Sequence, residues 1–418
     1  MPKKSIVIVT TTRAEYGLLS PIIHKLMEDE RLDVRVAVTG THLSAEHGNT
    51  VDEILADGVK PDVCIPILDT PDSGDAECTE QSRIQSRTLV GFGEYFGSRH
   101  ADAVLVLGDR FETLAVCMAA LDYRIPVIHM HGGETTEGAM DEMIRHAITK
   151  MSYLHLTSAE LHRKRVVQMG ENPDRVFNVG AMGVENALKV ELLDEDELAL
   201  QMAELKPVYC ADLTKGVNSE IREYIRKNLT NRMTAVLTFH SVTLEADTAL
   251  GQIREILATI KSHQDILFIA TKANADTGGR IINEALKEYA ENNSNLILFD
   301  SLGMRRYLSV ISYSSFVIGN SSSGLIEVPS LGVPTINIGD RQKGRLRGET
   351  VIDCEPIALE IDRAIETACT EEFQTICKSA VSPYGDGKTS KKVVEIITDY
   401  LLNNKLEIRK TFYEQEGI

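Results

Sequence analysis

Residues 103–112 read Ala-Val-Leu-Val-Leu-Gly-Asp-Arg-Phe-Glu, an apolar run that ends in glycine and then in charged side chains. An apolar run without polar alternation is typical of a strand that is buried on both faces of a parallel sheet. Similar runs, each followed by a segment that could be a helix, occur at residues 6–10, 34–39, 63–67, 127–130 and 154–157. This alternation of strands and helices predicts an α/β fold with a parallel sheet.

The alternation stops and then resumes, which predicts a second domain. The stretch from about Gly183 to Asn231 is charged and has no clear strand, so we expect it to hold the interdomain crossing and an amphipathic helix over Ile221 to Leu229. Strand-like runs return at residues 233–239, 266–270, 296–299, 316–318 and 335–338. Because 418 residues exceed the size of one ordinary core, we expect two Rossmann-like domains, residues 1–182 and 183–380, that face a central cleft.

Composition narrows the class of function. The formal net charge of −18 argues against nucleic acid or an anionic membrane as the main partner. The seven cysteines are odd in number and form no Cys-x-x-Cys pair, so we expect reduced thiols and no zinc site. No apolar run approaches the roughly 18 residues that span a bilayer, and the start lacks a signal-peptide core. We therefore expect a soluble cytoplasmic protein.

Three acidic side chains follow two neighbouring strand predictions. Asp109 comes directly after the strand at 103–107, Glu134 ends a Gly-Gly turn after the strand at 127–130, and Asp141 follows shortly. Ligands of open α/β sheets bind beyond the carboxyl ends of the strands, where carboxylates suit proton transfer. We expect the Gly-Gly turn to bring the backbone close to a ligand. The acids could instead hold magnesium, but no Asp-x-Asp pair is present, so we expect no metal.

Charged residues beside these acids are further candidates for substrate binding. Glu142 precedes Arg145 and His146 by one helical turn, so it can equally form ion pairs within a helix. We include Arg110, which adjoins the first acid, and retain Glu142, Arg145 and His146 with it.

A second candidate site follows the strand at 316–318 and reads Gly319-Asn-Ser-Ser-Ser-Gly-Leu-Ile-Glu327. Small residues let a diphosphate approach the amide nitrogens, and the helix dipole favours its negative charge. Glu327, which we place one turn inside that helix, could accept the ribose hydroxyls of a nucleotide. A serine N-cap explains one serine but not three followed by glycine, so we favour phosphate binding. The candidate contacts are Ser321, Ser322, Ser323 and Gly324.

Four polar residues occupy other predicted strand ends. Arg13 and the first amides of a helix could form a small anion site. His42 and His240 follow strands in equivalent positions of the two domains; simple exposure is the alternative for His42, and burial in the core for His240. Of the four cations between residues 341 and 347, we expect Arg341 to clamp a diphosphate, although such a run is usually a solvated loop.

Together these motifs resemble the UDP-N-acetylglucosamine 2-epimerase family, and they are most similar to its hydrolysing branch, which feeds the synthesis of sialic-acid-type sugars. The resemblance implies a GT-B fold, a C-terminal segment (residues 381–418) that packs back on the first domain, no cofactor, and a homo-oligomer, dimer or tetramer. It covers essentially the whole chain, through motifs that begin at Thr11, Val38, Gly108, His131, Asp141, Gly319 and Ser382.

The resemblance also implies roles for individual residues. Asp109, Glu134 and Asp141 match the catalytic acids of the family, and His240 matches its cleft histidine. Glu142 departs from the pattern, because an aspartate is common at that position. The matches to nucleotide contacts are Arg13, Ser322, Ser323, Glu327 and Arg341.

The implied reaction is elimination of UDP from UDP-N-acetylglucosamine to give a 2-acetamidoglucal, followed by addition of water to give N-acetylmannosamine. The run Thr136-Glu-Gly-Ala139 also resembles relatives that act on a 2,4-diacetamido-2,4,6-trideoxy sugar nucleotide, so two sugars stay open. A non-hydrolysing epimerase, a GT-B glycosyltransferase and a catalytically silent nucleotide-sugar sensor are the alternatives. The three clustered acids argue against the last two.

Overall fold

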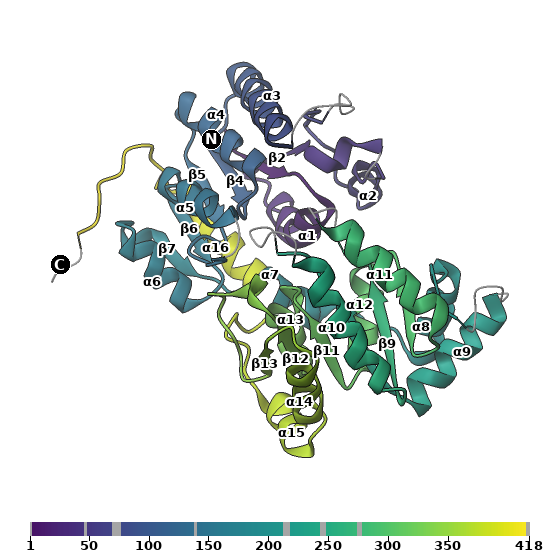
Figure 1. Cartoon of the computed structure of the whole chain (residues 1–418). Helices are drawn as coiled ribbons and strands as arrows, with labels where there is room; N and C mark the ends of the chain where they lie inside the picture. Colours follow the sequence, from purple (N-terminus) through teal and green to yellow (C-terminus); the bar gives the residue numbers. More distant parts are fainter. Residues whose placement is uncertain are drawn as a thin grey trace. The chain divides into compact units, whose positions relative to one another are not determined.

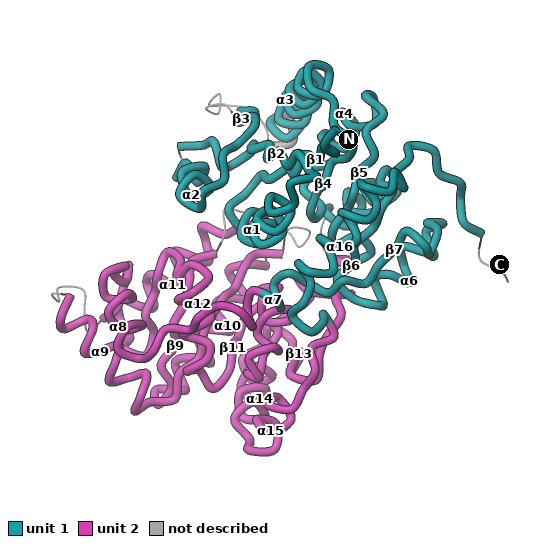
Figure 2. The backbone as a smooth tube through the Cα atoms, turned by 180° about the vertical axis from the view of Figure 1, so that it is seen from behind, with its two compact units in different colours: residues 1–134, 140–185, 384–418 teal, residues 135–139, 186–383 magenta. Residues whose placement is uncertain are grey.

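The computed structural model of the chain describes residues 2–45, 48–68, 77–137, 140–211, 218–242, 248–273 and 278–414. The chain divides into two compact units, shown in two colours in Figure 2. Unit 1 consists of residues 1–134, 140–185 and 384–418, and unit 2 of residues 135–139 and 186–383. The main boundary between the units therefore falls inside one helix, α7 (Met182–Lys189).

Unit 1 is built on a parallel sheet whose strand order, β3-β2-β1-β4-β5-β6-β7, reverses between β1 and β4. The pairing of Ile6 with Ala103 and of Ile8 with Leu105 sets the register of these two central strands. Ligands of such sheets bind beyond the carboxyl ends of the strands at the reversal. The strands described are β1 (Lys4–Thr10), β2 (Leu32–Thr39), β3 (Val63–Ile65), β4 (Ala103–Leu107), β5 (Val127–Met130), β6 (Leu154–Thr157) and β7 (Val176–Asn178).

Helices cover both faces of this sheet, because successive side chains of a strand point to opposite faces. Ile6 and Ile8 join a core with helices α1 and α16, whereas Val7 and Val9 join one with α3 and α4. The described helices of unit 1, besides the start of α7, are α1 (Arg13–Met27), α2 (Val51–Ala56), α3 (Glu77–Ser98), α4 (Phe111–Asp122), α5 (Asp141–Met151), α6 (Glu160–Gln168), α16 (Thr389–Leu402) and the 3₁₀ turns η1 (Gly40–Leu43) and η3 (Pro173–Arg175).

The C-terminal helix α16 belongs to unit 1, although nearly two hundred residues of unit 2 precede it (Figures 1 and 2). It packs against α1, and the Tyr400 hydroxyl donates a hydrogen bond of 2.8 Å to the carbonyl of Asp174. Beyond it, Lys410 Nζ lies 2.8 Å from both carboxylate oxygens of Glu171, which is almost fully buried.

Unit 2 repeats the same architecture. Its parallel sheet has the order β10-β9-β8-β11-β12-β13 and reverses between β8 and β11. The strands are β8 (Met233–Thr238), β9 (Ile266–Thr271), β10 (Leu296–Phe299), β11 (Phe316–Gly319), β12 (Thr335–Ile338) and β13 (Val351–Cys354). The described helices are α8 (Glu195–Leu205), α9 (Asn218–Asn231), α10 (Ala249–Ser262), α11 (Gly279–Asn292), α12 (Gly303–Ser312), α13 (Ser323–Ile326), α14 (Ala358–Ala368), α15 (Glu371–Ser379) and the 3₁₀ turns η4 (Val328–Leu331) and η5 (Asp340–Gln342).

The two parallel sheets and the return of α16 to unit 1 confirm the expected α/β class with two Rossmann-like units. The expectation for residues 183–231 was wrong in part. Most of this stretch is not a crossing but two helices, α8 and α9, whose residues Leu198, Met202 and Ile225 help to bury one face of the unit 2 sheet. Across the described part of the chain, no helix combines the length and apolar character that crossing a membrane requires.

Candidate active site

In unit 1, the segment after β4 carries the first predicted acid. Gly108 has a φ of +80°, a left-handed conformation that glycine adopts without steric cost. Its carbonyl oxygen lies 2.8 Å from Nε2 of His129, a fully buried histidine on the neighbouring strand β5. Burial lowers the pKa of His129 to about 3, so this ring is neutral and can donate to the carbonyl. The turn that presents Asp109 is therefore fixed by both backbone conformation and a buried hydrogen bond.

A buried cation, Arg145 on α5, gathers the acids around it. Its Nη2 and Nε lie 2.5 and 2.8 Å from Oδ2 of Asp109. Its Nη1 lies 2.7 Å from Oε2 of Glu142 and 2.9 Å from the carbonyl oxygen of Glu134. Burial by itself lowers the pKa of Arg145, but the charges of Asp109, Glu134 and Glu142 reverse this effect and raise it. An arginine that is 1% exposed needs such partners, because an unpaired buried charge is strongly unfavourable.

Glu142 makes both ion pairs that its spacing permits. Besides Arg145, its Oε1 lies 3.0 Å from Nε2 of His146, one turn further along α5. Asp141 lies exposed in the first turn of the same helix, and its charge contributes to raising the pKa of Arg110. The structure thus brings Asp109, Glu134, Asp141 and Glu142 into one region at the carboxyl ends of β4 and β5.

A second charged group surrounds Arg110, which contacts Glu112 and lies near two further acids. Its Nε lies 2.5 Å from Oε1 of Glu112, which is nearly buried. Burial favours a lower pKa for Arg110, but Glu112, Glu15 and Asp141 together raise it. Glu15 also lies at the carboxyl end of β1, where its Oε2 accepts hydrogen bonds from the backbone amide of Thr11 at 2.8 Å and its hydroxyl at 2.7 Å.

Sequence reasoning gave Glu15 no role. Burial raises its pKa to about 7, against the opposing effect of Arg110. One feature of the sequence could have indicated a role for Glu15. It lies in the first helical turn after a strand end, four residues after Thr11 and next to Tyr16, which is buried.

The other two predicted residues of unit 1 have partners within the unit. Arg13 Nε lies 2.9 Å from Oε2 of Glu53, and both side chains are half exposed. His42 is fully buried, so exposure, the alternative for this residue, was wrong. Its Nε2 lies 2.9 Å from the Thr10 hydroxyl and its Nδ1 2.8 Å from the Thr50 hydroxyl. Burial lowers the pKa of His42 to about 4, so the ring is neutral and links β1 to the start of α2.

Glu134 is buried, and its carboxylate contacts residues that follow β5 and β6. Its Oε1 accepts a hydrogen bond of 2.6 Å from the Ser158 hydroxyl and lies 3.2 Å from Nδ1 of His131. Sequence reasoning expected the Gly-Gly turn to admit a ligand. A Cβ at Gly133 would lie 2.4 Å from the carbonyl oxygen of His162, so the close approach of α6 requires glycine here, and the approach of a ligand to this turn stays a prediction.

In unit 2, Asn320 ties together the ends of three strands. It is 1% exposed; its Oδ1 lies 2.8 Å from the amide of His240, and its Nδ2 lies 2.7 Å from the His240 carbonyl. Its own carbonyl accepts from Gln342 Nε2 at 2.8 Å and from Arg341 Nη1 at 3.2 Å. His240 and Arg341 are thereby fixed at the strand ends. Sequence reasoning quoted Asn320 but assigned it no function.

The serine turn, residues 319–327, differs from the expectation in the length of its helix. Helix α13 (Ser323–Ile326) is a single turn, and Glu327 is its C-cap instead of lying one turn inside a longer helix. Pro329 follows in η4 and has no amide hydrogen to continue the helix. The side chain of Ser322 makes no capping hydrogen bond, and Ser321 Oγ accepts one of 3.4 Å from the amide of Ser323.

The two glycines of this turn are explained by packing within unit 2. A Cβ at Gly319, which has a φ of +135°, would lie 2.0 Å from the Thr238 carbonyl oxygen. At Gly324 it would lie 2.7 Å from the Thr335 side chain on β12. These close contacts hold the serines at the carboxyl ends of β8 and β11.

The cations that follow β12 have different environments. Lys343 lies 2.9 Å from Asp340 and is exposed, whereas Arg347 lies 2.6 Å from Asp353. Arg341, the predicted diphosphate contact, donates to the backbone carbonyl of Asn320, and its contact with a diphosphate stays a prediction. Of the run Thr136–Ala139 that bears on the sugar, Gly138 and Ala139 lie outside the described residues.

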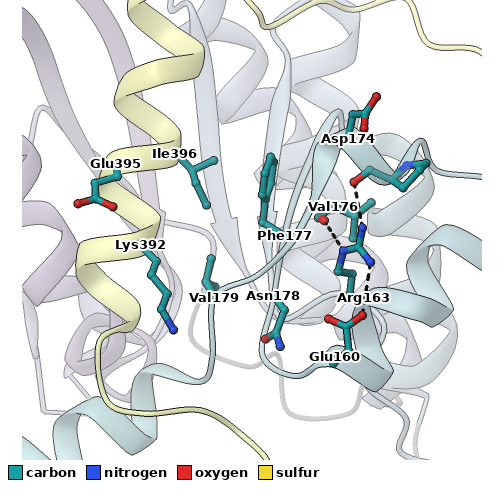
Figure 3. Close-up of a pocket in the computed structure, with 11 residues that line it drawn as sticks. Glu160, Arg163, Asp174, Val176, Phe177, Asn178, Val179, Lys392, Glu395 and Ile396 are labelled. Carbon is teal, nitrogen blue, oxygen red and sulfur yellow. Dashed lines mark hydrogen bonds and ion pairs between the residues drawn. The ribbon is translucent and has the colours of Figure 1, made fainter.

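A separate pocket of about 660 Å³ lies elsewhere on unit 1 (Figure 3). None of the predicted site residues lines it. Apolar and charged side chains both line it, and Arg163 Nε donates to the Val176 carbonyl at 2.8 Å. Its lining comes from α6, η3, β7 and α16: Glu160, Arg163, Pro173, Asp174, Val176, Phe177, Asn178, Val179, Lys392, Glu395 and Ile396.

Comparison with known proteins shows which family the sequence matches. Residues 24–398 match the family model described as UDP-N-acetylglucosamine 2-epimerase. The chain is 40% identical to the polysialic acid biosynthesis protein P7 of Escherichia coli, over 98% of this chain and 97% of that protein. It is 37% identical to the GDP/UDP-N,N'-diacetylbacillosamine 2-epimerase (hydrolyzing) of Campylobacter jejuni, over 90% of both chains.

Solved structures show the same fold at lower identity. The crystal structure of UDP-GlcNAc 2-epimerase from Neisseria meningitidis bound to UDP-GlcNAc has a TM-score of 0.75 at 18% identity. The match covers 94% of this chain and all of that one. By the family match and by its full-length relatives, the chain belongs to the UDP-N-acetylglucosamine 2-epimerase family, in its hydrolysing branch.

Proposed function

We propose that this protein is a hydrolysing 2-epimerase that converts UDP-N-acetylglucosamine to N-acetylmannosamine and UDP. The observation that carries the proposal is the gathering of Asp109, Glu134 and Glu142 on the buried Arg145, with Asp141 beside them, in a chain of this family. The 40% identity to a polysialic acid biosynthesis protein fits this product, because N-acetylmannosamine feeds the synthesis of sialic acids.

The chemistry requires negative charge near the sugar. The hydrogen on C2 is barely acidic, so cleavage of the C1–O bond runs ahead of its removal and positive charge grows on the ring. Carboxylates at Asp109, Glu134 and Asp141 stabilise that charge, and one of them takes the C2 proton to give the glycal. Water then adds at C1 while a proton is delivered to the opposite face of C2, which inverts that centre.

The leaving diphosphate requires cations and hydrogen-bond donors. We assign this role to His240, Arg341 and the serine turn at Ser322 and Ser323, together with Arg13. Asn320 supports the assignment, because it fixes the backbone of His240 and receives Arg341. Glu327, at the end of α13, is assigned to the ribose hydroxyls, which a carboxylate can accept from.

A second substrate is favoured by one observation. The Campylobacter jejuni relative is named for N,N'-diacetylbacillosamine, a 2,4-diacetamido sugar, and it is 37% identical over 90% of this chain. The same elimination and rehydration apply to this sugar, because the reacting carbons C1 and C2 are the same. The UDP-linked diacetamido sugar is therefore the alternative substrate of the same site.

The test is to incubate the full chain with each UDP-sugar in deuterated water and to follow the products by NMR. Release of UDP with free N-acetylmannosamine that carries deuterium at C2 is the expected result. Conversion of the diacetamido sugar alone would establish the second substrate. An intact UDP-linked epimer, transfer that depends on an added acceptor, or no change with both sugars would each overturn the proposal.

A further inference from the structure

A chain of three buried polar side chains leads from Glu134 into the interior of unit 1. The Ser158 hydroxyl lies 2.6 Å from Oε1 of Glu134 and 2.9 Å from Nδ1 of His162. Ser158 is fully buried, His162 is 1% exposed and Glu134 is 5% exposed. Ser158 follows β6 and His162 lies in α6, the helix that closely approaches Gly133.

The number of hydrogens fixes the direction of these bonds. Ser158 has one hydroxyl hydrogen, and a carboxylate can only accept, so ionised Glu134 must receive that hydrogen. The contact with His162 then requires a hydrogen on Nδ1 that points to Ser158 Oγ. When Glu134 is protonated it can donate to Ser158 instead, and Ser158 then donates to a bare Nδ1.

We propose that Ser158 and His162 are positioning residues that carry a proton to and from Glu134. The proposal rests on the proposed function, in which Glu134 is one of the reacting acids. In the resting protein Glu134 is a carboxylate and neutral His162 carries its hydrogen on Nδ1. When Nε2 of His162 takes up a second proton, the imidazolium gives its Nδ1 proton to Ser158 Oγ while Ser158 gives its own to Glu134. The result is protonated Glu134 and a neutral ring with its hydrogen on Nε2, and the reverse shift restores the carboxylate and the imidazolium.

The surroundings of Glu134 explain why such a path is useful. Among the described residues, His131 Nδ1 lies 3.2 Å from Oε1 of Glu134, and Arg145 binds its carbonyl and adds a positive charge. Arg165 binds the carbonyl of Gly133 at 3.0 Å, and the His162 ring lies 5.9 Å from that of Tyr384. Because Glu134 is nearly buried, a side-chain path is a direct way to change its protonation during a turnover.

The first test measures the position of the hydrogen on His162. Long-range ¹H–¹⁵N NMR of the full chain distinguishes the two neutral tautomers, and the His162→Asn variant identifies the signal by its loss. The expected result for the resting protein is neutral His162 with its hydrogen on Nδ1. A hydrogen on Nε2 with a bare Nδ1 would overturn the proposed direction of the chain.

The second test measures turnover of whichever UDP-sugar the unmodified protein converts. General acid–base groups typically contribute about 10²–10⁴ in rate, so we expect Ser158→Ala to lower kcat about tenfold or more with KM nearly unchanged. Ser158→Thr keeps the hydroxyl and should recover much of the rate. His162→Asn keeps an N–H near Ser158 but cannot hold a second proton, so its kcat should fall as well.

A matched control separates proton transfer from loss of a buried hydroxyl. Ser152 is equally buried, and its hydroxyl donates to the Ile148 carbonyl at 2.7 Å, away from Glu134. Ser152→Ala should keep kcat within roughly twofold. Unchanged kcat in Ser158→Ala or in His162→Asn, or an equal fall in Ser152→Ala, would overturn the proposal.

Failure of this inference is distinguishable from failure of the proposed function, because the tautomer measurement needs no turnover. An inactive protein in which His162 carries its hydrogen on Nδ1 would refute the function but leave the hydrogen-bond chain established. An active protein with the other tautomer would refute the chain alone.

Discussion

A single carboxylate oxygen of Asp109 accepts two hydrogen bonds from Arg145, from Nε at 2.8 Å and from Nη2 at 2.5 Å. This contact holds the carboxylate in one orientation at the end of β4. Asp109→Asn keeps the shape of the side chain but removes its charge, so we expect turnover to fall by about 10³ or more while UDP binding is nearly intact. NMR turnover assays and calorimetric titration with UDP measure the two quantities.

A surface pair provides the control for this substitution. Asp33 and Arg35 form a comparable contact of 2.5 Å on β2, outside the acid cluster. Asp33→Asn should leave both turnover and UDP affinity unchanged. Full activity of Asp109→Asn would contradict the role of Asp109 in the reaction.

Arg145 stabilises the fold as well as the site. Arg145→Met leaves the carboxylates of Asp109 and Glu142 close together without their buried cation, so we expect it to lower the free energy of unfolding by roughly 3–5 kcal/mol. Urea unfolding measures this loss. Adding Glu142→Gln to the variant should restore part of the stability, because one of the two uncompensated charges is gone. A variant as stable as the unmodified protein would contradict this account.

Glu15 makes stability depend on pH in a definite direction. Its pKa in the folded chain is about 7, against 4.5 as its ordinary value. Its contribution is therefore fully present below pH 4.5 and is lost as the pH rises through 7, by roughly 3 kcal/mol in all. Glu15→Gln removes this dependence. The free energy of unfolding of the variant, taken relative to that of the unmodified protein, should therefore be higher at pH 8 than at pH 5.

Unfolding measured at both pH values tests the effect. Glu53→Gln, at a half-exposed carboxylate in the same unit, is the control and should show no such rise. The same stability difference at pH 5 and pH 8 for Glu15→Gln would show that Glu15 is ionised without cost.

Two buried histidines should stay neutral in mild acid. Burial lowers the pKa of His42 to about 4 and that of His129 to about 3. Because the pKa of each ring is lower in the folded chain than in the unfolded chain, protonation opposes folding. The stability that the neutral rings contribute is present above pH ~6.5 and is lost as the pH falls toward 4 and below. Their ring resonances should therefore not titrate above pH 5, while imidazole added to the sample does. A midpoint near 6 for either ring would contradict its burial.

Asn320 should be required for the proposed binding of UDP. Asn320→Ala leaves the amide and carbonyl of His240 without their side-chain partners, so we expect the affinity for UDP to fall about tenfold or more. Asn295→Ala is the matched control, because Asn295 is fully buried and binds the Ile260 carbonyl at 2.8 Å, at the amino end of β10. It should lower stability without a comparable loss of affinity. Calorimetric titration with UDP decides between these outcomes.

The strands were predictable where apolar runs are long. The run at 103–107 became β4 with the same bounds, because a short apolar run that ends in glycine is typical of a strand buried on both faces. The short strands β7 and β13 were missed, since Val176–Asn178 and Val351–Cys354 each contain polar residues and have no apolar run. Strand order was not predictable, because the pattern of one strand does not specify its neighbours.

The candidate site was predictable in position but not in its partners. Asp109 follows β4 in unit 1 and His240 follows β8 in unit 2, so each lies at the carboxyl end of a strand in the parallel sheet of its own unit, as expected. The burial of Arg145, the raised pKa of Glu15 and the hydrogen bonds of Asn320 depend on elements distant in sequence, so spacing alone did not reveal them. The close approach of α6 to Gly133 is a further contact of this kind, which the sequence alone did not reveal.

The position of α16 has a consequence for biosynthesis. A ribosome makes residues 1–185 first, yet the apolar surface of α1 that α16 covers stays open until residues 389–402 have left the exit tunnel. The later-made residues 186–383 carry nearly everything that their own core needs. The unit synthesised first is thus the one completed last, and a nascent chain stalled before α16 exposes that surface to chaperones and proteases.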